Sequence, residues 1–336
     1  MGGDLSERNR TDQGTSNPVK SSVTRYPQAI LVSCEIPWDE NEMLMEEVFR
    51  RELRHVLTHF RHLYIFGTAG EGYAVDTARF RRIVEIFYAE TRGEDVHPMV
   101  GVIGLSTANF VERLTYAYAV GFRTFQISLP AWGALNDREL TTFFTDVCGA
   151  FPDASFLHYN LPRAQRILTG AEYRRLVETV PNLVATKNTA GGAARATDLM
   201  RNAPELQHFF GEANFPFGCM EGECSLLSSL GPTTPTKVHA FFNAGRDECW
   251  DECFRLQKGL RDLQHSLLSP LRDQSYIDGA YDKLLKRLGG FEEMPLRLLS
   301  PYHGISEEAY QRCRRRLHTQ FPEWVAPNIA HQNQTD

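Results

Sequence analysis

Short apolar runs alternate with longer segments of helical period eight times along the chain, and this alternation limits its possible folds more than any other feature. The first run is residues 29–36 (AILVSCEI), and apolar residues then recur at helical spacing over 40–60. The same pairing continues to the eighth run, 225–231 (SLLSSLG). Strands that alternate with helices pair in parallel and are joined by right-handed crossovers.

Eight strand–helix units in about 220 residues predict an α/β protein with a (β/α)8 TIM barrel. A doubly wound open sheet is the alternative. Such a sheet has fewer strands and carries a glycine-rich turn after the first one. Residues 33–40 (SCEIPWDE) contain no glycine, which favours the barrel.

The end of the alternation near residue 245 divides the chain. We expect the barrel over 25–245 and a small C-terminal region of three helices over 246–325, with helical patterns at 247–267, 275–289 and 306–321. Residues 1–24 are polar and predict a disordered tail. A flexible tail is expected over 326–336.

Charge and cysteine content exclude several classes of function. The net charge is -6 with a pI near 6.0, so no nucleic-acid or membrane partner is expected. No apolar run reaches the roughly 18 residues of a membrane span. Seven cysteines, an odd number without secretory features, indicate reduced thiols in a cytoplasm. Gly2 and Ser6 fit the loose myristoylation pattern, which leaves modification of Gly2 open.

Lys187 is the residue that most needs an explanation. It ends the sixth run, 183–187 (LVATK), whereas lysine is rarely buried unless it is paired or has a function. Catalytic groups of barrel enzymes lie at the carboxyl ends of the strands. An amine in an apolar pocket loses its proton and becomes a nucleophile that forms Schiff bases with carbonyl compounds.

Two further side chains are predicted at the same end of the barrel. Tyr159 ends the fifth run and precedes Lys187 by 28 residues, which is about one strand–helix unit. The two should therefore lie on adjacent strands at similar height, with the tyrosine as a proton carrier. Thr68 follows the second run. The turn Gly67-Thr68-Ala69-Gly70 offers backbone N–H groups and a hydroxyl to a carboxylate.

These landmarks resemble the dihydrodipicolinate synthase / N-acetylneuraminate lyase superfamily of class I pyruvate-type aldolases. The resemblance runs from about Tyr26 to the C-terminal helices. It rests on 67–71 (GTAGE) for the G-T/S-T-G-E turn, on 159–162 (YNLP) for Y-N-x-P, and on Lys187 for the Schiff-base lysine. Gly211 resembles the glycine after the seventh strand.

The resemblance implies catalytic roles for Lys187, Tyr159 and Thr68. It also implies a substrate-binding set, in which Trp132 and Arg163 come from loops and Leu227 from the eighth run. That set is Gly67, Ala69, Gly70, Trp132, Arg163, Gly211 and Leu227. No metal and no cofactor is expected.

The sequence departs from the synthase branch at three positions. Ala69 replaces the second hydroxyl residue of the turn, and Pro130-Ala131-Trp132 stands where that branch has a tandem tyrosine. The branch's arginine falls on Ala164, so Arg163 or Arg166 is expected to take its place. Trp132 is similar to a feature of the aromatic hydratase-aldolases, although it could equally pack against a neighbouring subunit.

We therefore predict a lyase that joins Lys187 to pyruvate or a related 2-oxo acid and makes or breaks the adjacent carbon–carbon bond. The aldehyde that it accepts and the direction of the reaction stay open. The alternatives are a sugar-acid dehydratase or hydratase-aldolase of the same superfamily, or a non-catalytic barrel that serves as a binding module. The resemblance also implies a homotetramer or homodimer.

Overall fold

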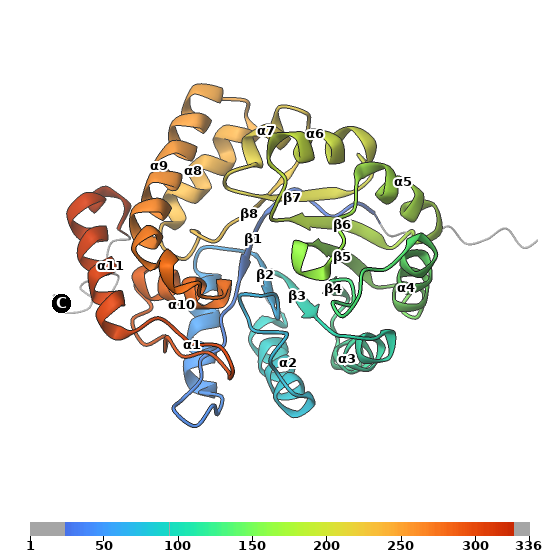
Figure 1. Ribbon diagram of the computed structural model, residues 1–336, viewed down its shortest axis with the longest axis horizontal. Helices are drawn as coiled ribbons and strands as arrows, with labels where there is room; N and C mark the ends of the chain where they lie inside the picture. Colours follow the sequence, from blue (N-terminus) through green and yellow to red (C-terminus); the bar gives the residue numbers. More distant parts are fainter. Residues whose placement is uncertain (1–23, 94, 326–336) are drawn as a thin grey trace, which may run out of the picture.

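A closed barrel of eight parallel strands forms the centre of the computed structural model, which describes residues 24–93 and 95–325 (Figure 1). The strands pair in sequence order, and β1 closes the barrel against β8. Their bounds are β1 Ile30–Ser33, β2 His62–Ile65, β3 His97–Val102, β4 Thr124–Ile127, β5 Ser155–Asn160, β6 Leu183–Asn188, β7 Gln207–Gly211 and β8 Ser225–Leu227.

Helices surround this barrel and complete the predicted (β/α)8 fold (Figure 1). They are α1 Glu46–Leu57, α2 Thr77–Thr91, α3 Thr107–Val120, α4 Asp137–Gly149, α5 Gly170–Thr179, α6 Gly192–Asn202, α7 Phe215–Cys219 and α8 Pro235–Arg246, with the 3-10 turn η1 Pro162–Ala164 after β5. The alternation of the sequence is thus confirmed as a barrel. No helix of the described residues combines the length and the apolar character that crossing a membrane requires.

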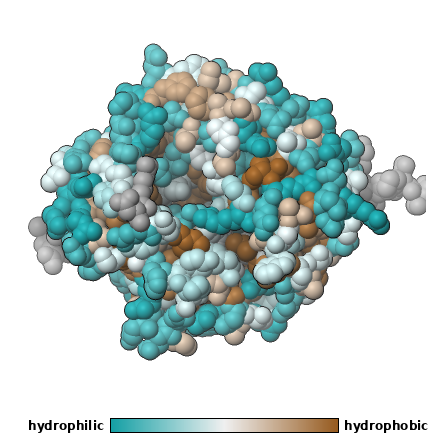
Figure 2. Space-filling model, viewed as in Figure 1, coloured by the Kyte–Doolittle hydropathy of each residue, from teal (hydrophilic) through white to brown (hydrophobic). Residues whose placement is uncertain are grey.

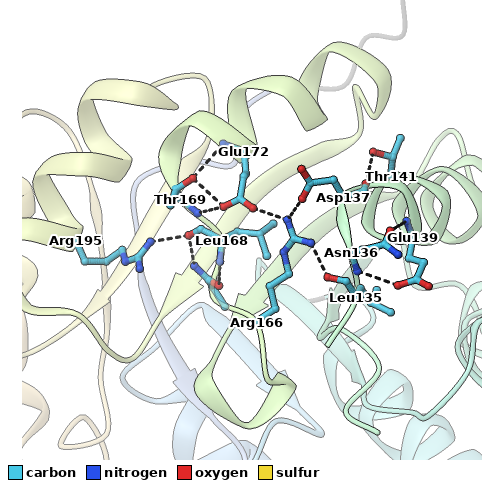
Figure 3. A network of polar contacts seen from close by, with 11 residues as sticks. Leu135, Asn136, Asp137, Glu139, Thr141, Arg166, Leu168, Thr169, Glu172 and Arg195 are labelled. Atoms are coloured by element: carbon cyan, nitrogen blue, oxygen red, sulfur yellow. Dashed lines mark hydrogen bonds and ion pairs between the residues drawn. The ribbon is translucent and has the colours of Figure 1, made fainter. Parts of the chain in front are cut away.

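Polar side chains set where the helices near η1 begin. Asn136 and Glu139 form a capping box at the start of α4, and Thr169 and Glu172 form another at the start of α5. Arg166 links these two starts: its guanidinium donates to Asp137 and Glu172 at 2.5 Å each (Figure 3). The loops that follow β4 and β5 are therefore fixed to each other.

The strands are shorter than some of the apolar runs that predict them. The run 29–36 yields only β1, because the chain leaves the barrel after Ser33 and places Glu35 against a lysine of the C-terminal region. The interior of the barrel is filled by one cluster that the strand residues dominate: Tyr26, Ala29, Leu31, Tyr64, Met99, Leu157, Val184, Ala185, Phe209 and Leu227. Its filled centre leaves the strand ends as the place for a site.

Three helices follow the barrel, as the sequence predicts: α9 Trp250–Leu268, α10 Asp278–Leu288 and α11 Glu307–Gln320. Helix α10 packs on the loops that carry the predicted site. A Cβ atom added to Gly279 would lie 3.2 Å from the carbonyl oxygen of Thr68. The expected N-terminal tail, apart from residue 24, and the expected C-terminal tail lie outside the described residues, as does Gly2.

Candidate active site

Lys187 and Tyr159 lie side by side on neighbouring strands. The register of β5 and β6 pairs Tyr159 with Lys187, which is the arrangement that their spacing predicts. Each is the penultimate residue of its strand, so both lie at the carboxyl end of the barrel.

The Lys187 amine is enclosed by two aromatic rings and one amide. Its Nζ lies 4.0 Å from the ring centroid of Tyr64 and 3.9 Å from that of Tyr159. The amine donates to Oε1 of Gln126 at 3.2 Å. Only 2% of the residue is exposed, and this burial lowers the pKa of Lys187 from 10.5 to about 7. A substantial fraction of the amine is therefore neutral near pH 7, as a nucleophile requires.

Tyr159 connects the lysine to the Gly67-Thr68-Ala69-Gly70 turn. The Thr68 hydroxyl lies near enough to the Tyr159 phenol to lower its pKa, against the larger effect of burial, and both residues are buried. Burial raises the pKa of Tyr159, so its phenol carries a proton at neutral pH. The structure thus brings together Lys187, Tyr159 and Thr68, the three predicted catalytic residues.

The glycines of this turn are required by close contacts. A Cβ atom on Gly67 would lie 2.6 Å from Cε2 of Tyr64 and 3.4 Å from Nζ of Lys187. On Gly70 it would lie 2.7 Å from the backbone nitrogen of Phe66. Side chains at these positions would displace the groups around the amine.

Helix α10 adds carboxyl groups to the site. Asp278 and Asp282 are one helical turn apart, and the charge of each raises the pKa of Lys187, against the larger effect of burial. Burial raises the pKa of Asp282 well above its ordinary value, and the nearby carboxyl groups of Glu35 and Asp278 raise it further. The C-terminal region therefore takes part in the electrostatics around Lys187.

Two other buried lysines come from α10, and both are paired with carboxylates. Lys283 Nζ lies 2.7 Å from Oε1 of Glu71. Lys286 Nζ lies 2.9 Å from Oε2 of Glu35 and 2.8 Å from Oε1 of Glu52. These ammonium groups are held as ion-pair partners, whereas the amine of Lys187 is held by a neutral amide.

A cavity of about 160 Å³ opens beside Thr68. Its walls are largely apolar. It is lined by Thr68, Tyr73, Ile103, Ser128, Leu129, Ala131, Leu161, Arg163, Ala164, Ile277 and Tyr302. Figure 2 shows apolar surface near the middle of this face of the molecule, surrounded by hydrophilic side chains. Thr68 belongs to the cavity wall and also interacts with Tyr159, whose ring contacts Lys187, so the cavity lies on the side of the site where Thr68 is.

A larger hollow, of about 610 Å³, lies between α3, α4 and the loop before α4. Thr107, Pro130 and Phe143 are among its lining residues. It contains none of the three predicted catalytic residues, so its greater size does not make it the site of the chemistry.

The two arginines that were expected near the substrate have different surroundings. Arg163 lines the small cavity, and its guanidinium forms two hydrogen bonds to Asp278 of α10, at 2.7 and 3.2 Å. Arg166 points away into the network of Asp137, Glu172 and the Leu135 carbonyl (Figure 3). Of the two, Arg163 is the one in reach of a ligand in this cavity.

Comparison with known proteins identifies the family of the chain. Residues 27–320 match the dihydrodipicolinate synthetase family. The chain belongs to this family. A 4-hydroxy-tetrahydrodipicolinate synthase from Nitratiruptor is 23% identical over 261 residues, which cover 74% of this chain and 87% of that protein. An N-acetylneuraminate lyase from Escherichia coli is 21% identical over 180 residues, or 53% of this chain and 59% of that protein.

Solved structures from the dihydrodipicolinate synthetase family and its lyase relatives share the fold. Dihydrodipicolinate synthase from Aquifex aeolicus superposes with a TM-score of 0.77 at 18% identity, covering 89% of this chain and 100% of that chain. N-acetylneuraminate lyase from Fusobacterium nucleatum gives a TM-score of 0.76 at 18% identity, covering 89% and 99%. A prophage protein of Escherichia coli K12 from the same family was solved in complex with pyruvate; it gives a TM-score of 0.75 at 15% identity, with 86% and 97% covered.

Of the seven predicted substrate-binding residues, only Arg163 lines the small cavity in this family member. Gly67, Ala69 and Gly70 belong to the turn beside it, and the other three lie elsewhere. Trp132 is 85% exposed, and its neighbour Ala131 lines the cavity instead. Leu227 is buried in the barrel interior and pairs with Gly211 in the β7–β8 register. Gly211 and Leu227 therefore support the barrel wall next to the site, and Trp132 faces solvent in the single chain.

Several residues near the amine escape prediction from the sequence. Tyr64 and Gln126 contact Lys187, but each is one polar residue inside an apolar strand, so only the barrel register shows that it points inward. Asp278 and Asp282 lie in a region that reads as a plain helical cap. The only sequence feature that points to them is that two acidic residues stand four positions apart, on one face of the helix.

Within the described residues, no group of three or more His, Cys, Asp or Glu side chains is arranged to hold a metal ion.

Proposed function

We propose that this family member is a class I lyase that forms a Schiff base between Lys187 and pyruvate or a related 2-oxo acid. It then makes or breaks the carbon–carbon bond next to the former carbonyl carbon. The observation that carries the proposal is the buried Lys187 amine, whose pKa is lowered to about 7, between the rings of Tyr64 and Tyr159. Membership of the family supports the same chemistry.

The reaction begins with attack of the neutral Lys187 amine on the C2 carbonyl carbon. Tyr159 supplies the proton that lets the carbinolamine oxygen leave as water, and the Thr68 hydroxyl interacts with this phenol. The iminium withdraws electrons, so loss of a proton from C3 gives an enamine. The enamine adds to the aldehyde carbon, whose oxygen takes up a proton, and water then hydrolyses the product iminium to free Lys187. Cleavage runs through the same steps in reverse.

Borohydride reduction in the presence of pyruvate tests the first step. We expect the wild-type protein to gain a covalent adduct that peptide mapping places on Lys187, and Lys187→Ala to remove both the adduct and turnover while the fold survives. Lys237, a partly exposed lysine of α8 outside the site, serves as the internal reference. An adduct on Lys237 in place of Lys187 would overturn the assignment, and no adduct on either would favour the non-catalytic barrel.

The cavity favours an acceptor with an apolar or aromatic portion over a sugar acid. Its walls include Ile103, Leu129 and Leu161, and burial of apolar surface there contributes about 25 cal/mol per Å². Ala69 and Ala164 stand where the synthase branch has a hydroxyl residue and an arginine. We therefore expect no useful turnover of pyruvate with aspartate semialdehyde. A kcat/KM of ~10⁴ M⁻¹s⁻¹ with that pair, as native substrates reach, would contradict this substrate class.

A cytoplasmic location and a homo-oligomeric state belong to the same proposal. The seven cysteines are free thiols in the structure, which suits a reducing compartment. Most oligomers of soluble proteins are closed and symmetric. A homodimer or homotetramer is accordingly expected.

A further inference from the structure

The phenol of Tyr73 is a polar group that has no role in the proposed Schiff-base chemistry at Lys187. Its hydroxyl oxygen is buried and has no hydrogen-bond partner among the described residues. Buried polar atoms are nearly always hydrogen-bonded, because an unpaired one costs about 1–3 kcal/mol. Tyr73 also lines the small cavity next to Thr68. A partner for this hydroxyl would therefore come from a molecule in the cavity.

The backbone around Tyr73 is held rigidly. The Arg113 guanidinium donates to the carbonyl oxygens of Gly72 at 3.1 Å and Val75 at 2.8 Å, on both sides of Tyr73. A Cβ atom on Gly72 would lie 2.4 Å from the carbonyl oxygen of Phe66, so only glycine fits there. The ring of Tyr73 packs edge-on against Tyr302 with centroids 5.1 Å apart. A side chain fixed in this way is suited to selecting one ligand geometry.

The size and charge of the cavity limit the chemical class of ligand that can bind in it. A dry apolar cavity of about 150 Å³ holds a benzene molecule, and this one measures about 160 Å³. Its one cationic lining residue, Arg163, is already neutralised by Asp278. Burial raises the pKa of Tyr73, so the phenol keeps its proton and can donate it. The cavity thus suits a ring-sized apolar group that carries one uncharged acceptor.

We propose that Tyr73 determines specificity at the aldehyde end of the site, where its hydroxyl bonds a single hydroxyl or carbonyl group on an otherwise apolar, ring-sized portion of the substrate. This inference rests on the proposed Schiff-base lyase function and adds the substrate class. A site that hydrogen-bonds a substrate group strongly rejects analogues that lack it, because its own buried polar group is then left unpaired.

The test compares benzaldehyde with its three monohydroxy isomers as acceptors for pyruvate. We expect the wild-type protein to favour at least one hydroxybenzaldehyde over benzaldehyde by about tenfold or more in kcat/KM. Tyr73→Phe should reduce that preference to within about threefold and leave borohydride trapping of pyruvate unchanged. Tyr302→Phe is the matched control, because it removes a phenol from the same cavity wall and should keep the preference.

Trapping and selectivity separate the two proposals. Absence of pyruvate trapping in the wild type contradicts the proposed function itself. A wild type that traps pyruvate, yet adds none of the hydroxylated aldehydes or adds benzaldehyde equally well, contradicts the inference without any variant. The inference is also contradicted if the preference for the hydroxylated aldehyde survives in Tyr73→Phe or is lost in Tyr302→Phe. The wild-type comparison decides the matter even if a variant fails to fold.

Discussion

At the scale of single residues, we expect the surroundings of Lys187 to set the pH at which the proposed Schiff base forms. Only the neutral amine attacks a carbonyl, and burial lowers the pKa of Lys187 to about 7. We therefore expect the rate of pyruvate trapping to rise with pH through a midpoint near 7 and to level off above it. Initial rates between pH 5.5 and 9.5 measure this. A midpoint above pH 9 would mean that the amine is not desolvated as the structure has it.

The same burial makes Lys187 costly for stability. The folded pKa of about 7 lies below the ordinary value of 10.5, so the unfolded chain binds more protons between these pH values. The destabilisation is complete below pH 7 and fades as the pH rises toward 10.5. Lys187→Met should therefore raise the free energy of unfolding by a few kcal/mol at pH 6 and by much less at pH 10. Urea denaturation at both pH values measures this difference. A difference that stays constant or grows with pH would contradict the prediction.

Tyr159 and Tyr64 offer a matched pair for the proton transfer. Their ring centroids lie 3.9 and 4.0 Å from the Lys187 nitrogen. The Thr68 hydroxyl lowers the pKa of the Tyr159 phenol, whereas Ser33 has this effect on Tyr64. Tyr159→Phe should slow turnover by roughly 10²–10⁴, the usual size of general acid–base catalysis. Tyr64→Phe keeps its ring at the amine and should have a much smaller effect. Unchanged turnover in Tyr159→Phe would leave that side chain a packing role only, and equal losses in both variants would mean that Tyr159 is not the specific proton carrier.

Prediction from the sequence reached some of these residues and missed others for a physical reason. Lys187, Tyr159 and Thr68 follow from the ends of β6, β5 and β2, which the alternating pattern locates to within two residues. Tyr73 and Gln126 depend on which way a side chain points, which register and loop packing decide. Their chemistry becomes visible only once the barrel is closed.

At the scale of elements, helix α10 joins the C-terminal region to the reactive end of the barrel. Lys286 reaches Glu35 and Glu52, and Lys283 reaches Glu71 in the turn after β2. The sequence predicts α10 as a helix, but its pattern does not show that this face meets buried carboxylates. Long-range packing, and not local propensity, gives the helix its place in the site.

The Lys286 cluster provides a test of that anchoring. Burial alone would lower the pKa of Lys286, but the attraction of Glu35 and Glu52 raises it above its ordinary value, so the lysine is charged in the folded state. Lys286→Met leaves two carboxyl groups without their partner and should lower the free energy of unfolding by about 3–5 kcal/mol.

The exposed pair of Lys258 and Asp262 supplies the control. Lys258→Met should change stability by no more than about 1 kcal/mol, as is usual for surface pairs. Guanidinium denaturation of the two variants measures the difference. Similar values for both would mean that α10 is not anchored by its buried charges.

At the scale of the whole molecule, two large apolar side chains are left exposed on one side of the barrel. Trp132 is 85% exposed in the loop before α4, and Leu105 is 61% exposed in the loop before α3. Thr107 and Pro130, next to these loops, line the hollow of about 610 Å³ between the two helices. Large apolar side chains left exposed in loops beside a hollow are typical of a contact with another molecule.

A second copy of the chain is the partner that we expect there. The resemblance to the superfamily implies a homodimer or homotetramer, and a symmetric dimer would bury Trp132 of both copies at once. Light scattering at micromolar concentration should give at least twice the mass of 38.2 kDa. Because each aromatic side chain buries roughly 150–250 Å² in an interface, Trp132→Ser should shift the assembly toward monomer, whereas exposed Phe254 of α9, changed to serine, should leave it intact. A wild-type monomer, or an assembly that Trp132→Ser leaves unchanged, would show that this tryptophan does not form the contact.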